Sequence, residues 1–187
     1  MIYGVVESTN SGSTHYAERI FDCVCAKDVE NGMFGYMDGL AEGFDHIYNF
    51  VAGAPAEGQS VVVVDQPAWT EDECRRSNQR RDKFFVPAGT PFRVRVVKVN
   101  DEYAFNIMAF AEASREKVEG VTDFVGTDVF VTIGEDGKLV AADAATEGAV
   151  MEGRIMRKRI SGAALVTEVR NYGYPYALYT AKIKTLA

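Results

Sequence analysis

The chain of 187 residues has little of what most catalytic and metal-binding sites are built from: two histidines, three cysteines and one tryptophan. No run of about 18 apolar residues occurs, which argues against a membrane-spanning helix. The first residues show neither a basic segment nor a long apolar core, so the sequence predicts no signal peptide. With 47% hydrophobic and 25% charged residues, the composition is that of a soluble globular protein made in a cytoplasm.

The odd number of cysteines argues against a secreted disulfide framework. Cys23 and Cys25 lie two positions apart in an apolar run, so on a strand they share one face as small buried hydrophobic residues. The alternative is half of a metal site. It would need further ligands, and Cys74, His15 and His46 are the remaining candidates, without ligand-type spacing. The sequence favours core packing, and we predict no metal ligands.

Neither histidine belongs to a motif that combines a nucleophile, a base and a group orienting that base. The chain also lacks a glycine-rich phosphate loop between a strand and a helix and a Walker-type lysine. Gly35, Gly39 and Gly43 recur at a spacing of four in an acidic, aromatic stretch, where we expect turn glycines. We therefore predict no catalytic residues, no cofactor and no enzymatic activity.

Charge is distributed unevenly along the chain. Residues 1–69 carry ten acidic and two basic side chains, a net charge of −8, whereas residues 150–187 carry two acidic and seven basic ones, a net charge of +5. This gradient argues against general nucleic-acid binding, which requires a clear basic excess. It is compatible with head-to-tail contacts between copies, with docking on an acidic partner, or with unrelated solvated faces.

Short β-type runs separated by turn residues dominate the pattern. The run at 60–67 is continuous and β-branched, which is typical of a strand buried on both faces. The alternation at 91–99 predicts a half-exposed antiparallel strand with a wet, basic face, and its cations suit a sheet edge. Residues 127–142 indicate a hairpin whose turn uses Gly137. Further strands are expected at 1–6, 19–26, 45–51, 84–89, 101–107, 149–160, 164–171 and 177–184.

One helix is predicted over 71–81, where Thr70 and Glu73 form a capping box and four arginines follow toward the far end. Residues 110–120 fit a helix or a loop equally well. Trp69 is expected to pack this helix onto a sheet. The sequence thus predicts a mainly β (α+β) fold of antiparallel β-barrel, β-tulip or sandwich modules with one short capped surface helix. The predicted domains are 1–110 and 121–187, with the boundary within 108–126.

Exposed cations and tyrosines are the best candidates for an interaction surface. The tyrosine-rich loop at 172–176 favours a protein interface over nucleic acid, because tyrosine is enriched at interfaces. The basic cluster around Arg157 lacks the flanking aromatic platform of single-strand binders. The predicted interface residues are Arg93, Arg95, Arg154, Arg157, Arg159, Tyr172, Tyr174 and Tyr176.

The order of segments over residues 59–160 resembles the auxiliary capsid proteins of tailed bacteriophages, the head-decoration or cement proteins. The resemblance rests on VVVVDQPAWTEDE, an arginine-rich segment, VPAGTPFRVRVVKVNDEYAFN, and GTDVFVTIGEDGKLVAADAATEGAVMEGRI. It implies a β-barrel or β-tulip module and a protein made in the host cytoplasm that binds the outer surface of the virion.

The partners that this resemblance implies are the major capsid protein and further copies of the chain itself, with no nucleic acid and no membrane. The function it implies is to bridge or stabilise capsid subunits. A different class also fits the sequence: a small β-barrel that binds a ligand or carbohydrate, free or as an adhesin. Such a module should show a pocket lined by aromatic side chains. For that reason Trp69, Phe84, Phe85 and the tyrosines of 172–176 are the residues to inspect.

Overall fold

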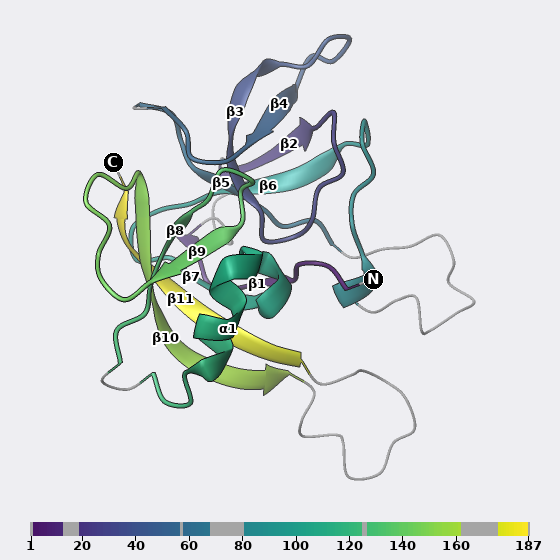
Figure 1. Ribbon diagram of the computed structural model, residues 1–187. Helices are drawn as coiled ribbons and strands as arrows, with labels where there is room; N and C mark the ends of the chain where they lie inside the picture. The colour runs from purple at the N-terminus through teal and green to yellow at the C-terminus, as the bar shows by residue number, and fades with distance from the viewer. Residues whose placement is uncertain are drawn as a thin grey trace, which may run out of the picture.

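The strands of the protein form two sheets that pack on each other. The computed structural model describes residues 2–12, 19–56, 58–67, 81–124, 127–161 and 176–186. One sheet has six strands in the order β1-β7-β11-β10-β8-β9, and the other is a closed barrel in the order β2-β4-β3-β5-β6. Figure 1 shows the barrel above the sheet, with the single α-helix of the described segments beside the sheet. The predicted mainly β fold is therefore confirmed.

The barrel is built from a contiguous part of the chain. Its strand β6 pairs antiparallel with both β5 and β2, which closes the ring. The pair β2–β4 is parallel, so the barrel is not antiparallel throughout as the sequence predicted. The reason is topological: strand direction cannot alternate all the way around a ring of five strands, and since the other four pairs are antiparallel, β2 and β4 must be parallel. The barrel strands are β2 (Ile20–Val24), β3 (Phe34–Leu40), β4 (Ile47–Ala52), β5 (Val62–Val64) and β6 (Phe92–Val96).

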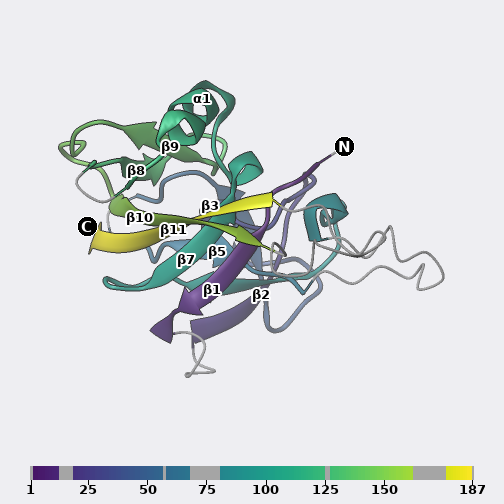
Figure 2. The same cartoon turned by 90° about the horizontal axis from the view of Figure 1, so that it is seen from below.

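The six-stranded sheet takes its strands from both ends of the chain, and all of its pairs are antiparallel. β1 and β7 precede the boundary predicted within 108–126 and the other four strands follow it, so the sheet contains segments of both predicted domains. Figure 2 shows β1, β7, β11 and β10 side by side. The strands are β1 (Val6–Asn10), β7 (Glu102–Asn106), β8 (Phe130–Ile133), β9 (Leu139–Ala142), β10 (Met151–Ser161) and β11 (Tyr176–Leu186).

Strand β5 and its neighbour Val61 join the two cores. Val61 and Val63 belong to the core beneath the six-stranded sheet, together with Phe105 and Tyr179. Val62 and Val64 belong to the core inside the barrel. Alternate residues of a strand point to opposite faces, so the continuous valine run fills both cores at once. The prediction of a strand buried on both faces is confirmed.

The turn of the β8–β9 hairpin fastens the sheet to the barrel. The Phe34 N–H donates to the Gly137 carbonyl at 2.7 Å, and the Lys138 ammonium pairs with Glu30 at 3.2 Å. Gly137 has φ +77°, and a Cβ at this position would lie 2.4 Å from the Phe34 carbonyl oxygen. The predicted hairpin and its glycine are confirmed, and the glycine is required for the close approach as well as for the turn.

The α-helix of the described segments is α1 (Glu112–Gly120), in the region where helix and loop were equally expected. It buries Val118 in the core beneath the sheet, and its Ser114 hydroxyl accepts a bond from the Ala141 N–H at 3.0 Å. Two short 3-10 turns are η4 (Arg81–Lys83) and η5 (Ile107–Ala109). The helix predicted over 71–81 lies outside the described residues except for Arg81, as do Trp69 and the strand predicted at 164–171.

The structure differs from the prediction for two strands. The apolar start 1–6 was predicted as a strand, but β1 is Val6–Asn10 and includes the polar residues that follow. Polar residues are tolerated there because β1 is an edge strand that pairs with β7 alone. At 84–89 the expected strand is reduced to a single bridge between Val86 and Val29.

Strand β3 was missed because glycines and acids obscure its pattern. Gly39 and Gly43 do have positive φ angles, as expected of turn glycines. Gly39 lies near the end of β3, at its register shift, and Gly35 lies near the start of the strand, where a Cβ would come within 2.1 Å of the Val51 carbonyl oxygen. Gly35 is needed for close packing against β4.

Candidate interaction surface

Three of the predicted arginines lie on one face of strand β10. Arg154, Arg157 and Arg159 are opposite Lys182, Thr180 and Leu178 of β11. These partners alternate along β11, so they share a face, and residues directly opposite each other in an antiparallel pair share it too. The register shift between Ile155 and Arg157 explains why a spacing of three keeps two arginines on the same side. We call these four cations, Arg154, Arg157, Arg159 and Lys182, the cationic row.

The cationic row lies on the side of the sheet away from the barrel. Ile155 and Ala181 are paired neighbours of the row and belong to the core that faces the barrel and α1. Arg157 and Arg159 are exposed, whereas Arg154 is half-buried. Thr180 and Leu178, which lie opposite Arg157 and Arg159 on this face, are buried, so the two exposed arginines border a covered part of the sheet.

Acidic neighbours hold part of this row in place. Arg154 pairs with Asp128, and the Lys182 ammonium lies 4.0 Å from Glu102. The Arg157 Nε donates to the Thr180 hydroxyl at 3.4 Å. Such contacts reduce the freedom of the side chains without neutralising the whole row.

Glu7 of the edge strand β1 joins the row to η4. Its carboxylate pairs with Arg159 of β10 and, at 3.0 Å, with Arg81. Two cations therefore converge on one carboxylate, which leaves a local positive excess at this end of the sheet.

The other two predicted arginines, Arg93 and Arg95, lie elsewhere. They belong to β6, which has partners on both sides, so the expectation of a sheet edge at 91–99 is wrong. The Arg95 Nε pairs with Asp65, which also accepts a bond from the Ser8 hydroxyl at 2.9 Å. Ser8 and Glu7 are consecutive in β1 and point to opposite faces of the strand. The two arginine groups are thus separated by β1, and Arg95 braces the barrel against the sheet.

Of the three predicted interface tyrosines, one lies within the described residues. Tyr172 and Tyr174 lie outside the described residues. Tyr176 is the first residue of β11 and pairs with Ser161 through its backbone. Their assignment to an interface stays a prediction.

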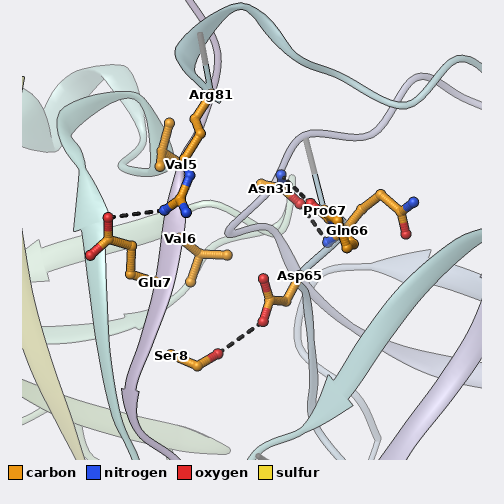
Figure 3. A pocket seen from close by; sticks show the side chains of 9 residues that line it. All are labelled: Val5, Val6, Glu7, Ser8, Asn31, Asp65, Gln66, Pro67 and Arg81. Carbon is orange, nitrogen blue, oxygen red and sulfur yellow. Dashed lines mark hydrogen bonds and ion pairs between the residues drawn. The ribbon is translucent and has the colours of Figure 1, made fainter. Parts of the chain in front are cut away.

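A groove of about 380 Å³ lies between β1 and the segment that follows β5 (Figure 3). Ser8 and Asp65 meet across it, and Glu7 and Arg81 pair at its upper end. The Asn31 side chain is held by two bonds to the backbone of Gln66, at 2.8 and 2.9 Å. The lining residues are Val5, Val6, Glu7, Ser8, Asn31, Asp65, Gln66, Pro67 and Arg81.

Phe84 and Phe85 do not line this groove, whereas Trp69, Tyr172 and Tyr174 lie outside the described residues. Phe85 packs against Tyr3 with ring centroids 4.9 Å apart, and Phe84 packs against the barrel core. Among the described residues that line it, none is aromatic. The groove therefore has the size of a small-molecule site, and the described part of its lining offers no aromatic stacking surface.

Cys23 and Cys25 both contribute to the barrel core, which confirms the packing prediction. Burial, with a smaller effect from the nearby Asp22 charge, raises the pKa of the Cys23 thiol from 9.0 to about 12. This thiol is protonated at neutral pH and is a poor nucleophile. Cys74 lies outside the described residues. Within the described ranges, no three His, Cys, Asp or Glu side chains are placed to hold a metal ion together.

Sequence reasoning missed one exposed feature, the tip of the β3–β4 hairpin at 38–46. Leu40, the last residue of β3, is 53% exposed, and Phe44, in the loop that follows, is 42% exposed. The same segment carries the acidic residues Asp38, Glu42 and Asp45. The two turn glycines at spacing four were the available signal, but the strand before them was not recognised. We call residues 38–46 the hairpin tip.

Comparison with known proteins identifies no relative. No protein-family model, no curated protein and no solved structure matches this chain. No helix in the described part of the chain is long and apolar enough to cross a bilayer.

Proposed function

We propose that this chain is a virion structural protein that binds the outer surface of a phage capsid and bridges or stabilises the major capsid protein subunits. Two things support the proposal: the resemblance of residues 59–160 to head-decoration proteins, and the cationic row. The row is the observation that carries the argument, because it gives the protein an extended charged surface on a rigid scaffold.

The row is suited to a broad, acidic protein surface. Arg154 and Arg159 are five residues apart on one strand, a span of about 15 Å. Guanidinium groups bind carboxylates through two parallel hydrogen bonds, so they favour defined acidic contacts over diffuse attraction. Several such groups along one strand can contact two neighbouring subunits at once, which is what a bridging protein requires.

Co-sedimentation with capsids that lack the protein tests this function. The wild-type chain should pellet with the capsids, and the binding should weaken as salt is added because exposed charges are screened. The double variant Arg157→Glu, Arg159→Glu reverses the two exposed charges of the row and should weaken binding at least about tenfold, a loss of about 1.4 kcal/mol.

The matched control is Lys27→Glu, which reverses an exposed charge on a loop of the barrel. It should bind capsids as the wild type does. Failure of the wild-type chain to pellet would contradict the proposed function. Equal loss of binding in the control and the double variant would show that total charge, and not the row, is responsible.

The second candidate, a ligand- or carbohydrate-binding module, is favoured by the groove beside β1. Its volume is in the range of small-molecule sites, and its carboxylate and amide groups are able to bind hydroxyls. However, Asp65 and Asn31 already bond within the protein. Saturable binding of a saccharide by titration calorimetry, in a protein that does not pellet with capsids, would favour this candidate.

A further inference from the structure

We infer that the hairpin tip of one copy docks on the cationic row of another copy, so that the protein associates head to tail. This contact uses the same cationic row that the proposed function places against the capsid, but it is measurable with the purified chain alone. It is argued from the apolar side chains of the tip, the opposite charges of the two surfaces, and their positions at different ends of the molecule.

The hairpin tip displays two large apolar side chains on a fixed backbone. The Ala41 N–H donates to the Ile47 carbonyl at 2.8 Å, and the Phe44 N–H donates to the Ala41 carbonyl at 3.1 Å. The Asn49 amide adds a bond to the Leu40 carbonyl at 3.2 Å. A tip that is already ordered loses little conformational entropy on binding. Leu40 and Phe44 are thus presented as binding anchors.

The charges of the tip complement those of the row. Asp38, Glu42 and Asp45 are all exposed, and the tip has no lysine or arginine. The row offers guanidinium groups that pair with carboxylates and also stack on an aromatic ring such as that of Phe44.

An exposed methionine lies next to the row in the chain. Met156, at the register shift of β10, is 42% exposed and comes directly before Arg157. A methionine adapts its shape to an apolar partner, and the stems of the arginines add further apolar area.

The two surfaces are unable to meet within one molecule. In Figure 1 the β3–β4 hairpin lies at the top and the β10–β11 pair at the bottom. In Figure 2, which looks from below, the β10–β11 side is nearest the viewer and the barrel lies behind. A contact between them must therefore join different copies. Because it uses two different patches, it is heterologous and leads to a ring or an open chain.

Sedimentation velocity of the purified full chain tests this inference. At low salt, the weight-average mass should rise between about 1 µM and about 1 mM protein, and added salt should reverse the rise. The double variant Leu40→Ser, Phe44→Ser should stay monomeric over this range. Its thermal unfolding should match that of the wild type, since both side chains are exposed.

A charge exchange identifies the contact. Glu42→Arg reverses one charge of the tip and Arg157→Glu reverses one charge of the row, so each variant alone should associate at least about tenfold more weakly. An equimolar mixture of the two should associate again, because each tip then meets a complementary row. Glu147→Arg, on the exposed loop between β9 and β10 and outside both the tip and the row, is the matched control and should associate as the wild type does.

Two results would overturn the inference. One is a wild-type chain that remains monomeric at all concentrations. The other is association that the tip and row variants leave unchanged, or that their mixture does not restore. Capsid binding is measured separately, so a monomeric chain that still pellets with capsids would refute the head-to-tail contact and leave the proposed function standing.

Discussion

The barrel and the six-stranded sheet solve the problem of open strand edges in different ways. The barrel is closed by the β6–β2 pair, so each of its strands has two partners. The sheet remains open, with β1 and β9 at its edges. In the closed barrel the candidate surface is a connection between strands, the hairpin tip. In the open sheet it is formed by side chains of the strands themselves, the cationic row. The two candidate surfaces follow from this difference.

The two cores also differ in their residue composition. The barrel core is mostly valine with Phe50, Phe92 and Cys23, whereas the sheet core is larger and gathers aromatic residues such as Phe110, Phe124 and Tyr179. Phe110 and Phe124 both meet the Tyr179 ring edge-on, at 5.9 and 6.1 Å between centroids. The stability of the barrel therefore rests mainly on packing between valines of its strands. The stability of the sheet rests on contacts between aromatic residues from distant segments of the chain.

Substitution in the β8–β9 turn, which connects the sheet to the barrel, should lower the free energy of unfolding the most. Gly137→Ala combines a positive φ angle with a contact at 2.4 Å, and we expect it to lower the free energy of unfolding by about 3 kcal/mol or more. Gly148→Ala is the matched control, because φ is +75° but the space around it is open. It should cost about 1 kcal/mol. Urea denaturation measures both, and equal losses would mean that the turn does not anchor the barrel.

Truncating neighbouring valines of β5 should separate the two cores. Val62→Ala and Val63→Ala each remove buried methyl groups, and we expect each to cost about 2 kcal/mol. Hydrogen exchange should then show faster opening in the barrel strands for Val62→Ala and in β7 and β11 for Val63→Ala. Identical exchange patterns would show that the cores open as one unit.

Alkaline pH should weaken the barrel before the sheet. The pKa of Cys23 is raised from 9.0 to about 12 in the folded protein, so the stability it contributes is full below pH 9 and is lost as pH rises toward 12. At pH 10.5 this loss should be about 2 kcal/mol, calculated from the two pKa values. Burial, and to a smaller extent the Glu119 charge, also raises the pKa of Tyr179 above 10.0, so the sheet is affected later.

Urea denaturation at pH 8 and pH 10.5 measures this loss. Cys23→Ala should remove it, whereas Cys25→Ala, the matched change at the half-buried neighbour, should keep it. An unchanged pH dependence in Cys23→Ala would contradict the assignment.

The smallest expected effect is the difference in stability between removing Arg95 and removing Arg159. Arg95 and Asp65 retain 15% and 19% of their side-chain exposure, so Arg95→Ala leaves a poorly solvated carboxylate and should cost about 2 kcal/mol. Arg159, which keeps 41% exposure, pairs with Glu7 near the surface, and Arg159→Ala should cost less than about 1 kcal/mol. Thermal unfolding at low and high salt distinguishes them, because the Arg159 contribution should decline with salt. Equal costs would place both groups in the same kind of environment.

Much of the local structure was predictable from the chain. The valine run of β5, the turn at Gly137, the alternation of β6 and the paired cysteines were all recognised, because each depends on a side-chain period or on backbone freedom that neighbouring residues reveal. The boundaries of β1 and the existence of β3 were missed. In both, pairing with another strand outweighs a sequence that is polar or rich in glycine.

The candidate surface was only half predictable. The basic character of Arg154, Arg157 and Arg159 is evident in the sequence, but their common face depends on the irregular register of β10 against β11. Arg93 and Arg95 show the same alternation with cations, and yet Arg95 is engaged inside the molecule by Asp65. The exposure of Leu40 and Phe44 has no sequence signature, because a buried and an exposed apolar residue look alike in a loop.

The sequence by itself therefore determined a mainly β fold, the shared valine strand and the separation of acidic and basic segments along the chain. The tertiary structure decided which of those charges act together. Barrel closure and the β7–β11 pair bring together residues that are far apart in the chain. Strand β1 separates the two arginine groups: Arg95 lies between the barrel and the sheet, and Arg159 lies on the other side of the sheet. Such long-range pairing depends on packing in three dimensions, which no local pattern of residues records.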